Sequence, residues 1–364
     1  MPTSEAEHLH LAGTGNVAEL ERKLREYYGM SHALCVSSAT TGLLAIALAL
    51  QVRNHDFLTT PYTYGASLAG WLLLGNRPVF ADINSDELGL DPIQARRRIT
   101  ARTRAILAVD IFGTPCDMVG LRRLADEHGL WYIADAAQSF GACRDDLPAS
   151  SLADALVVSF TTGKTLAAGE GGAVLTNRSD IYEKLVWWTQ HPQRQRRDLG
   201  LDLDNEFALN GRIHPTAAMC ANRMFAASLE QLQIRQRDCF AILDALNETG
   251  LTQPACFDRR QIQPSFFRLT AAWKSASRGD ELCRHLRRQG WHADLTPAPV
   301  RLIYQQTAFL AQYGHRMLTV PRCPHAERQA GRRFVVGTTA QRGTLKSVDF
   351  CQMANRLAFP RLGV

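Results

Sequence analysis

The chain has 364 residues, of which 46% are hydrophobic and 21% are charged. This composition is typical of a globular protein large enough for one large domain and a smaller companion. A formal charge of +6 is too small to favour nucleic-acid binding. The nine cysteines form no Cys-x-x-Cys pair, so we expect reduced thiols, no zinc ribbon, no thioredoxin motif and no metal site.

The opening residues, MPTSEAEHLHLAGTG, lack the basic and apolar segments of a signal peptide. The longest apolar runs, such as LLAIALALQV at 43–52, are shorter than the ~20 residues needed to span a membrane. We therefore expect a cytoplasmic protein that binds neither membrane nor nucleic acid.

The first two thirds of the chain alternate between two patterns. After a helix predicted at 17–28, short apolar runs typical of buried strands alternate with helical patterns. We predict strands near 32–37, 57–61, 78–83, 105–113, 131–137, 155–160 and 171–177, and helices near 40–50, 67–75, 91–99 and 117–129. This order indicates βαβ units and a mainly parallel sheet with helices on both faces.

The pattern changes after about residue 180. A polar, arginine-rich loop is predicted at 190–212, a long helix at 215–248, and a small α+β unit from about 255. We therefore predict an α/β fold with two parts. A large domain with a mainly parallel sheet covers residues 1–240, a smaller C-terminal α+β domain covers 241–364, and the long helix connects them.

Two motifs have an ordinary structural interpretation beside a functional one. Gly13-Thr-Gly15-Asn-Val-Ala18 matches a dinucleotide fingerprint, but the preceding HLHLA is short and polar and no acidic residue follows at the expected distance. We interpret it as a helix start. The arginines at 194, 196 and 197 either clamp phosphates or belong to a solvated loop, and both interpretations stay open.

Several reactive or polar side chains follow the predicted strands. In open parallel sheets, ligands bind beyond the carboxyl ends of the strands. Because these groups come from separate strand ends, we expect them to converge on one crevice. They are Ser38–Thr40, Thr63–Tyr64, Asp110, Asp135–Gln138 and Ser159–Lys164.

Lys164 stands between two buried-strand patterns, ALVVSF and AVLT. Alone it fits a surface lysine near a turn, just as Asp135 alone fits a helix cap. A lysine near the interior needs a partner or a chemical use, however, and a desolvated lysine is the usual Schiff-base nucleophile. Hydroxyls at Ser159 and amides at the helix start of Ser38–Thr40 suit a phosphate. With Asp135 for a pyridine nitrogen and Tyr64 for its ring, the set predicts a pyridoxal 5'-phosphate site.

These residues lie in stretches that resemble the DegT/StrS sugar-aminotransferase family. The family comprises fold-type I pyridoxal-phosphate enzymes with the aspartate-aminotransferase fold. The resemblance covers roughly residues 15–235 and is most specific in ADAAQSFGA and SFTTGKTLAAGEGG. The matching stretches are VSSATTGLLAIAL (36–48), PYTYGAS (61–67), PVFADI (78–83), DIFGTPCDM (110–118), ADAAQSFGA (134–142), SFTTGKTLAAGEGGAVLTN (159–177) and NGRI (210–213).

The resemblance implies roles for three residues around the cofactor ring. Lys164 is implied as the Schiff-base lysine and as the acid and base that moves the proton. Asp135 is implied as the partner of the pyridinium nitrogen. Gln138 is implied to contact the side of the ring that carries the 3-hydroxyl.

The resemblance also implies how the rest of the cofactor is held. Ser159 is a phosphate ligand, Ala39 and Thr40 supply phosphate-binding amides, and Tyr64 stacks on the ring. Asn210 matches an asparagine that reaches the phosphate of the partner subunit in the family. The implied assembly is a homodimer with shared active sites.

The implied activity is amino transfer with pyridoxal phosphate, and with pyridoxamine phosphate as the intermediate form. The donor is an amino acid such as L-glutamate or L-glutamine. The acceptor is a keto sugar, a nucleotide-linked keto sugar or a keto cyclitol, in amino-sugar, antibiotic or other natural-product biosynthesis. The resemblance leaves the identities of donor and acceptor and the regiochemistry open.

Two departures from the family pattern keep alternatives open. Asp110 replaces a usual histidine and is expected to face the cofactor region, and Ala39 replaces a usual glycine in the phosphate loop. One alternative is a pyridoxal-phosphate enzyme of different outcome, such as elimination or other chemistry at the α-carbon. Another is a non-catalytic regulator on the same fold.

Overall fold

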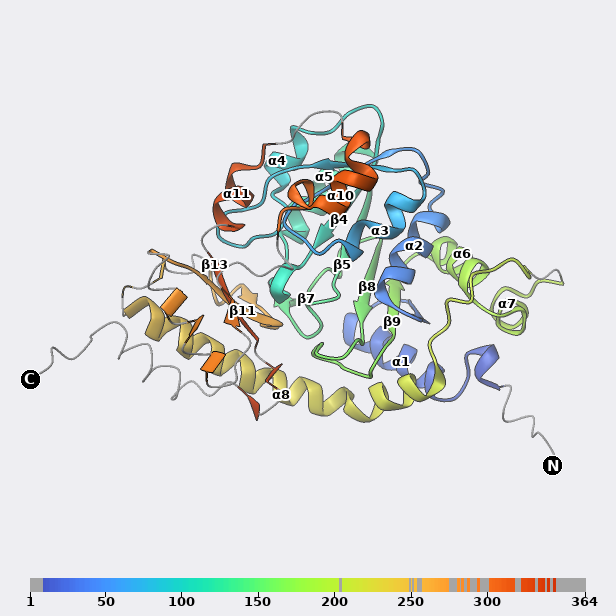
Figure 1. Ribbon diagram of the computed structural model, residues 1–364. Coiled ribbons are helices and arrows are strands. Elements are labelled where there is room, and N and C mark those ends of the chain that lie inside the picture. Colours follow the sequence, from blue (N-terminus) through green and yellow to red (C-terminus); the bar gives the residue numbers. More distant parts are fainter. Residues whose placement is uncertain are drawn as a thin grey trace, which may run out of the picture.

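The computed structural model describes residues 9–344, except 203–204, 249, 251, 254–256, 275–279, 282, 285–286, 289–292, 295–300, 318–321, 331–332, 338 and 341–342. Figure 1 shows a central sheet enclosed by helices, with one long helix running beneath it. The helices are α1 (Asn16–Tyr28), α2 (Ala39–Ala49), α3 (Ala66–Leu73), α4 (Pro92–Arg96), α5 (Met118–His128), α6 (Ser179–Thr189), α7 (Pro192–Leu199), α8 (Pro215–Glu248), α10 (Thr307–Tyr313) and α11 (Pro324–Ala330).

The main sheet has seven strands in the order β1-β9-β8-β5-β4-β2-β3. β9 runs antiparallel to both of its neighbours, and the other pairs from β8 to β3 are parallel. The strands are β1 (His32–Val36), β2 (Asp56–Thr59), β3 (Arg77–Phe80), β4 (Thr103–Val109), β5 (Trp131–Asp135), β8 (Ala155–Ser159) and β9 (Gly172–Thr176). The predicted α/β fold with a mainly parallel sheet is confirmed.

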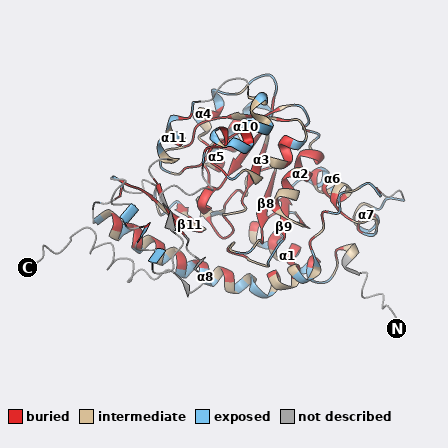
Figure 2. Ribbon diagram, viewed as in Figure 1, coloured by how far each residue is buried: buried red, intermediate tan, exposed pale blue. Residues whose placement is uncertain are grey.

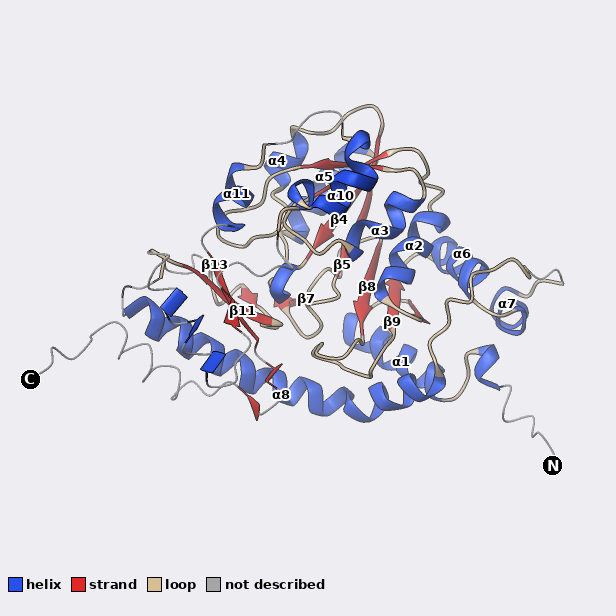
Figure 3. Cartoon of the chain, viewed as in Figure 1, coloured by secondary structure: helices blue, strands red, loops and turns tan. Residues whose placement is uncertain are grey.

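Helices cover both faces of the main sheet, as Figure 3 shows. Buried side chains of α2, α3 and α6 pack on one face. Those of α1, α5 and the first part of α8 pack on the other. Almost every residue of the central strands is buried, which places the core on both sides of the sheet (Figure 2). Apolar runs on both faces are what a parallel sheet requires.

A second, small sheet follows the long helix. It has the order β11-β13-β12 and consists of β11 (Arg268–Ala272), β13 (Arg333–Gly337) and β12 (Ala293–Asp294). In Figure 1 this sheet lies beside α8. The helix predicted at 215–248 matches the bounds of α8. The division of the chain into domains at residue 240 stays a prediction.

The segment predicted as a loop at 190–212 contains a helix, α7. Pro192 occupies the first turn, where its missing N–H costs nothing, and Gly200 ends the helix with a left-handed φ of 61°. Within α7, Arg194 is buried, and it donates to both carboxylate oxygens of Glu21 at 2.9 and 2.8 Å. Neither interpretation of this arginine, a phosphate clamp or a solvated side chain, is correct.

The glycines before α1 start a helix, as interpreted from the sequence. The residues before them form a short 3-10 helix, Leu9–Ala12, and not a strand. A Cβ on Gly13 would lie 2.5 Å from the Arg194 guanidinium, and the φ of Gly13 is +71°. Gly13 therefore leaves space for the buried side chain of Arg194.

In the part of the chain described above, no helix combines the length and apolarity that a membrane span requires.

Candidate functional site

A cavity of about 370 Å³ opens at the carboxyl ends of the parallel strands. Its lining includes all of the predicted cofactor-binding residues except Asn210, and the predicted strand-end groups converge on it with the exception of Asp110. The predicted residues along its wall are Ala39, Thr40, Tyr64, Asp135, Gln138, Ser159 and Lys164. Tyr64 is 57% exposed and stands at the rim.

A closed loop between β8 and β9 positions Lys164. The Thr162 N–H donates to the carbonyl of Gly169 at 2.9 Å, and the Ala168 N–H donates to that of Phe160 at 2.8 Å. The backbone N–H of Lys164 itself donates to the Thr161 carbonyl at 3.1 Å. The backbone therefore fixes the point from which the lysine side chain enters the cavity.

The Lys164 ammonium lies in an environment that disfavours its charge. Burial lowers its pKa from 10.5 to about 8, Asp135 opposes this shift, and the positive charge of Arg268 adds to it. The Nζ atom lies 4.3 Å from the centre of the Phe267 ring. A lysine with this pKa is partly neutral near physiological pH, so its amine can act as a nucleophile or a base.

Asp135 ends β5 with its side chain buried. Its Oδ1 atom accepts a hydrogen bond from the Ala137 N–H at 3.0 Å, so the carboxylate caps the following turn as well as lining the cavity. Gln138 Oε1 accepts from the Phe112 N–H at 2.7 Å. That bond directs the glutamine amide group and supports Phe112, a non-glycine residue with a φ of +59°.

The N-terminus of α2 forms another wall of the cavity. Ser38 caps the helix by accepting from the Thr41 N–H at 3.1 Å. Ser159 lies opposite at the end of β8 and donates to Thr161 Oγ1 at 3.2 Å. Helix N–H groups and hydroxyls in this arrangement suit an anion. Ala39 is the first residue of the helix, and its side chain is buried.

The lysine loop and the α2 N-terminus touch at Gly172. A Cβ at this position would lie 2.7 Å from the Ala39 nitrogen and 2.9 Å from the Ser38 carbonyl carbon. Real Cβ atoms do not approach backbone so closely, so only glycine fits. The first residue of β9 therefore holds two walls of the cavity together.

The expectation that Asp110 faces the cofactor region is wrong. Its Oδ2 atom accepts from the Ser139 and Ser150 hydroxyls, both at 2.7 Å, and its Oδ1 atom accepts from the Cys116 N–H at 2.8 Å. Burial raises its pKa. Val109 is paired with Asp135 across β4 and β5, so these two side chains point to the same face of the sheet. Asp110 is one residue further along and therefore points to the opposite face, away from the cavity. Asp110 is part of the scaffold beneath the site.

Asn210 is exposed and lies outside the cavity of its own chain. The backbone around it is anchored beside the segment that leads into α2. The Ser37 N–H donates to the Gly211 carbonyl at 2.7 Å, and Arg212 forms a bridge with Val36. This segment therefore presents Asn210 outward.

Sequence reasoning missed part of the cavity wall. Phe112 comes two residues after Asp110 at the end of β4. The other residues of this part of the wall belong to the small sheet or directly precede it. The segment SFFRLTAAW (265–273) lies in the region predicted only as a small α+β unit, and its two adjacent phenylalanines are a weak signal of a cavity wall. The missed residues include Phe112, Phe267, Arg268 and Val335.

Residues 5–342 match the model of the DegT/DnrJ/EryC1/StrS aminotransferase family. The chain belongs to this family. One relative is the UDP-2-acetamido-2-deoxy-3-oxo-D-glucuronate aminotransferase of Pseudomonas aeruginosa. It is 34% identical over 240 residues, and this match covers 65% of this chain and 66% of that protein. The GDP-perosamine synthase of Vibrio cholerae is 34% identical over 171 residues, 47% of each chain. The matched stretches span about half to two thirds of these relatives.

A solved structure of the family agrees in fold. The structure of DesI, determined in the presence of its TDP-sugar product, has a TM-score of 0.77 and 28% identity, and the match covers 95% of this chain and 85% of DesI. The resemblance to the family inferred from the sequence is thereby confirmed, together with the fold class.

Proposed function

We propose that this chain is a pyridoxal-phosphate-dependent aminotransferase that moves an amino group from an amino acid to a keto sugar or keto cyclitol. The single observation that carries the proposal is Lys164, whose pKa is lowered to about 8 inside a cavity lined by Asp135 and the α2 N-terminus. Family membership and relatives named as amino-sugar transaminases support the same activity.

The residues of the cavity fit pyridoxal phosphate. A buried carboxylate, Asp135, suits a protonated pyridine nitrogen. The amides of Ala39 and Thr40 and the hydroxyl of Ser159 suit the phosphate. Because Gln138 Oε1 already accepts from Phe112, its amide nitrogen is the group left to donate to the 3-hydroxyl side. Bound pyridoxal phosphate would supply the electron sink that stabilises negative charge at the donor's α-carbon.

The chain's own groups supply binding, orientation and proton movement. Lys164 Nζ would hold the cofactor, and as a free amine it would take a proton from the donor's α-carbon. The neutral amine is available because burial and the charge of Arg268 lower its pKa. The rings of Phe112 and Phe267 line the same cavity and exclude water from the reacting atoms.

We also propose a homodimer in which Asn210 of each subunit reaches the phosphate site of its partner. Asn210 is exposed, and it lies close to Phe207, whose side chain is 93% exposed. An apolar ring this exposed on an anchored segment is typical of a protein interface.

The test of the proposed activity uses purified protein with pyridoxal phosphate. We expect yellow protein that loses its colour when L-glutamate or L-glutamine is added. The released keto acid should be 2-oxoglutarate from L-glutamate or 2-oxoglutaramate from L-glutamine. A panel of keto sugars, with and without a nucleotide, should restore the colour and yield an aminated product. Colourless protein after reconstitution, or release of ammonia in place of amino transfer, would contradict the proposal.

A further inference from the structure

Arg268, the first residue of β11, lines the cavity that contains Lys164 and also a second, smaller cavity behind it. Its guanidinium is half-buried, and burial lowers its pKa. Among the described residues it has no carboxylate within ion-pair distance, and its recorded contact is the Phe267 ring, with 5.2 Å from Cζ to the ring centre. Removing an arginine from water is costly when no anion accompanies it.

Arg268 and Lys164 lie against the same phenyl ring. The Phe267 ring centre is 4.3 Å from Lys164 Nζ and 5.2 Å from Arg268 Cζ. The charge of Arg268 contributes to the lowered pKa of Lys164, so the two cationic groups are close. Asp135 is the sole acidic residue on the described wall of this cavity. The described wall therefore has an excess of positive charge.

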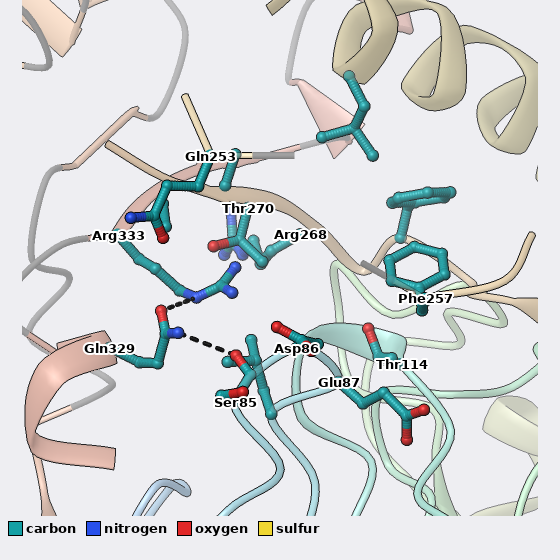
Figure 4. A pocket seen from close by; sticks show the side chains of 15 residues that line it. Ser85, Asp86, Glu87, Thr114, Gln253, Phe257, Arg268, Thr270, Gln329 and Arg333 are labelled. Carbon is teal, nitrogen blue, oxygen red and sulfur yellow. Dashed lines mark hydrogen bonds between the residues drawn. The ribbon is translucent and has the colours of Figure 1, made fainter. Parts of the chain in front are cut away.

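The smaller cavity does not supply the missing anion. It has a volume of about 50 Å³, room for a few water molecules, and Figure 4 shows that Arg333 lines it together with Arg268. Arg333 is buried, and its Nε atom donates to Gln329 Oε1 at 2.9 Å. Two carboxylates, Asp86 and Glu87, line this cavity as well, and Glu87 is paired with Arg144 at 2.7 Å. Neither carboxylate forms an ion pair with Arg268, so the described residues of the smaller cavity leave the larger cavity as the side from which an anion can reach it.

We infer that Arg268 binds the carboxylate of the amino donor. This inference rests on the proposed aminotransferase function. The planar guanidinium matches a carboxylate with two parallel hydrogen bonds. The α-carboxylate of an amino acid is bonded to the carbon whose proton Lys164 removes, so it comes close to any group beside that lysine. The phosphate of a nucleotide-linked sugar is attached to the anomeric carbon, several bonds from the keto carbon.

The test measures binding and not turnover. Glutarate carries the carboxylates of an acidic donor but no amino group, and UDP carries phosphates but no carboxylate. Isothermal titration calorimetry on the pyridoxal-phosphate-loaded protein compares wild type with Arg268→Gln, Arg268→Lys and the exposed control Arg53→Gln. We expect glutarate binding to weaken by about 10- to 100-fold in Arg268→Gln, the loss of hydrogen bonds to a charged group. Arg268→Lys should lie in between, and UDP binding should not change.

The two probes distinguish a carboxylate site at Arg268 from a phosphate site. Weaker UDP binding with unchanged glutarate binding would assign Arg268 to a phosphate and overturn the inference. Unchanged binding of both probes in Arg268→Gln, or no glutarate binding by wild type, would also overturn it. If Arg268→Gln unfolds, the Arg268→Lys variant keeps the charge and gives the same comparison. Failure of the proposed function is distinct, because it appears as wild-type protein that stays colourless with pyridoxal phosphate and releases no 2-oxoglutarate.

Discussion

Glu21 and Arg194 form a buried ion pair in which both guanidinium nitrogens of the arginine, Nη1 and Nη2, contact a carboxylate oxygen, at 2.9 and 2.8 Å. The pair joins α1 to α7, which are far apart in the sequence. Glu21 Oε1 also accepts from the Cys35 N–H at 2.8 Å, which extends the connection to β1. An arginine of the segment predicted as a loop thus connects three elements of the fold.

Removing one partner of this pair leaves an uncompensated charge in the interior. We expect Arg194→Met to lower the free energy of unfolding by about 3–5 kcal/mol, measured by urea denaturation. The double variant Glu21→Leu/Arg194→Met should recover much of that loss, because both charges are gone. Arg53→Met, at an exposed position outside this network, is the control. A single variant as stable as wild type would contradict the structural role.

Lys164 is expected to be the covalent attachment point of the cofactor. Borohydride reduction of pyridoxal-phosphate-loaded wild type should leave a permanent adduct on Lys164, located by mass spectrometry of peptides. Lys164→Ala should form no such adduct and should lose about 10²–10⁴-fold in activity or more. Lys184→Ala, at an exposed lysine, should behave as wild type. A reducible adduct in Lys164→Ala would refute the assignment.

The pH dependence follows from the pKa of Lys164, about 8. In cofactor-free protein, an amine-selective reagent should modify Lys164 at a rate that rises with pH and reaches half its plateau near pH 8. Between about pH 8 and the ordinary value of 10.5, the unfolded chain binds more protons here than the folded one. Stability should therefore rise with pH in that window, relative to Lys164→Met. A Lys164 midpoint at the ordinary lysine value of 10.5 would show that burial does not lower its pKa as described.

Asp135→Asn separates the charge of the carboxylate from its shape. The asparagine carbonyl can still accept from the Ala137 N–H, so we expect the fold and the melting temperature to be retained. Turnover should fall by about 10²-fold or more, because a neutral amide does not stabilise a protonated pyridine nitrogen. Asp91→Asn, at the cap of α4, is the matched control. Near-normal turnover in Asp135→Asn would remove this residue from its proposed role.

The assembly proposal makes Phe207 an interface residue. We expect Phe207→Asp to shift the protein from dimer to monomer, measured by light scattering after size-exclusion chromatography. Val119→Asp alters another exposed apolar residue and should leave the dimer intact. Mixing inactive Lys164→Ala and Asn210→Ala subunits should restore part of the activity, since one shared site then has both groups. A wild-type monomer would contradict the proposal.

The strand and helix order and the site loops could be predicted because they depend on local patterns. Buried parallel strands are apolar throughout, and ligand groups follow their carboxyl ends. Position along a strand end does not give side-chain direction, so Asp110 was wrongly expected beside the cofactor. Its partners Ser139 and Ser150 are 29 and 40 residues away in sequence, and no local pattern connects them.

The contribution of the small sheet was also beyond sequence reasoning. Arg268 and Val335 reach the cavity because β11 pairs with β13, and such long-range pairing depends on the folded chain. The helix α7 was missed since a run of glutamines and arginines without apolar spacing resembles a loop. Its stability comes from Arg194, whose partner lies on another element.

The close contact at Gly172 has a consequence for how the site is assembled. The backbone atoms of Ser38 and Ala39 lie against this residue, and its strand follows directly on the loop that carries Lys164. The backbone spacing between the Lys164 loop and the start of α2 is therefore set during folding, before any ligand arrives. A ligand that binds both Lys164 and the α2 N-terminus has to match this fixed distance. An analogue that is longer or shorter would lose its contact with one of the two.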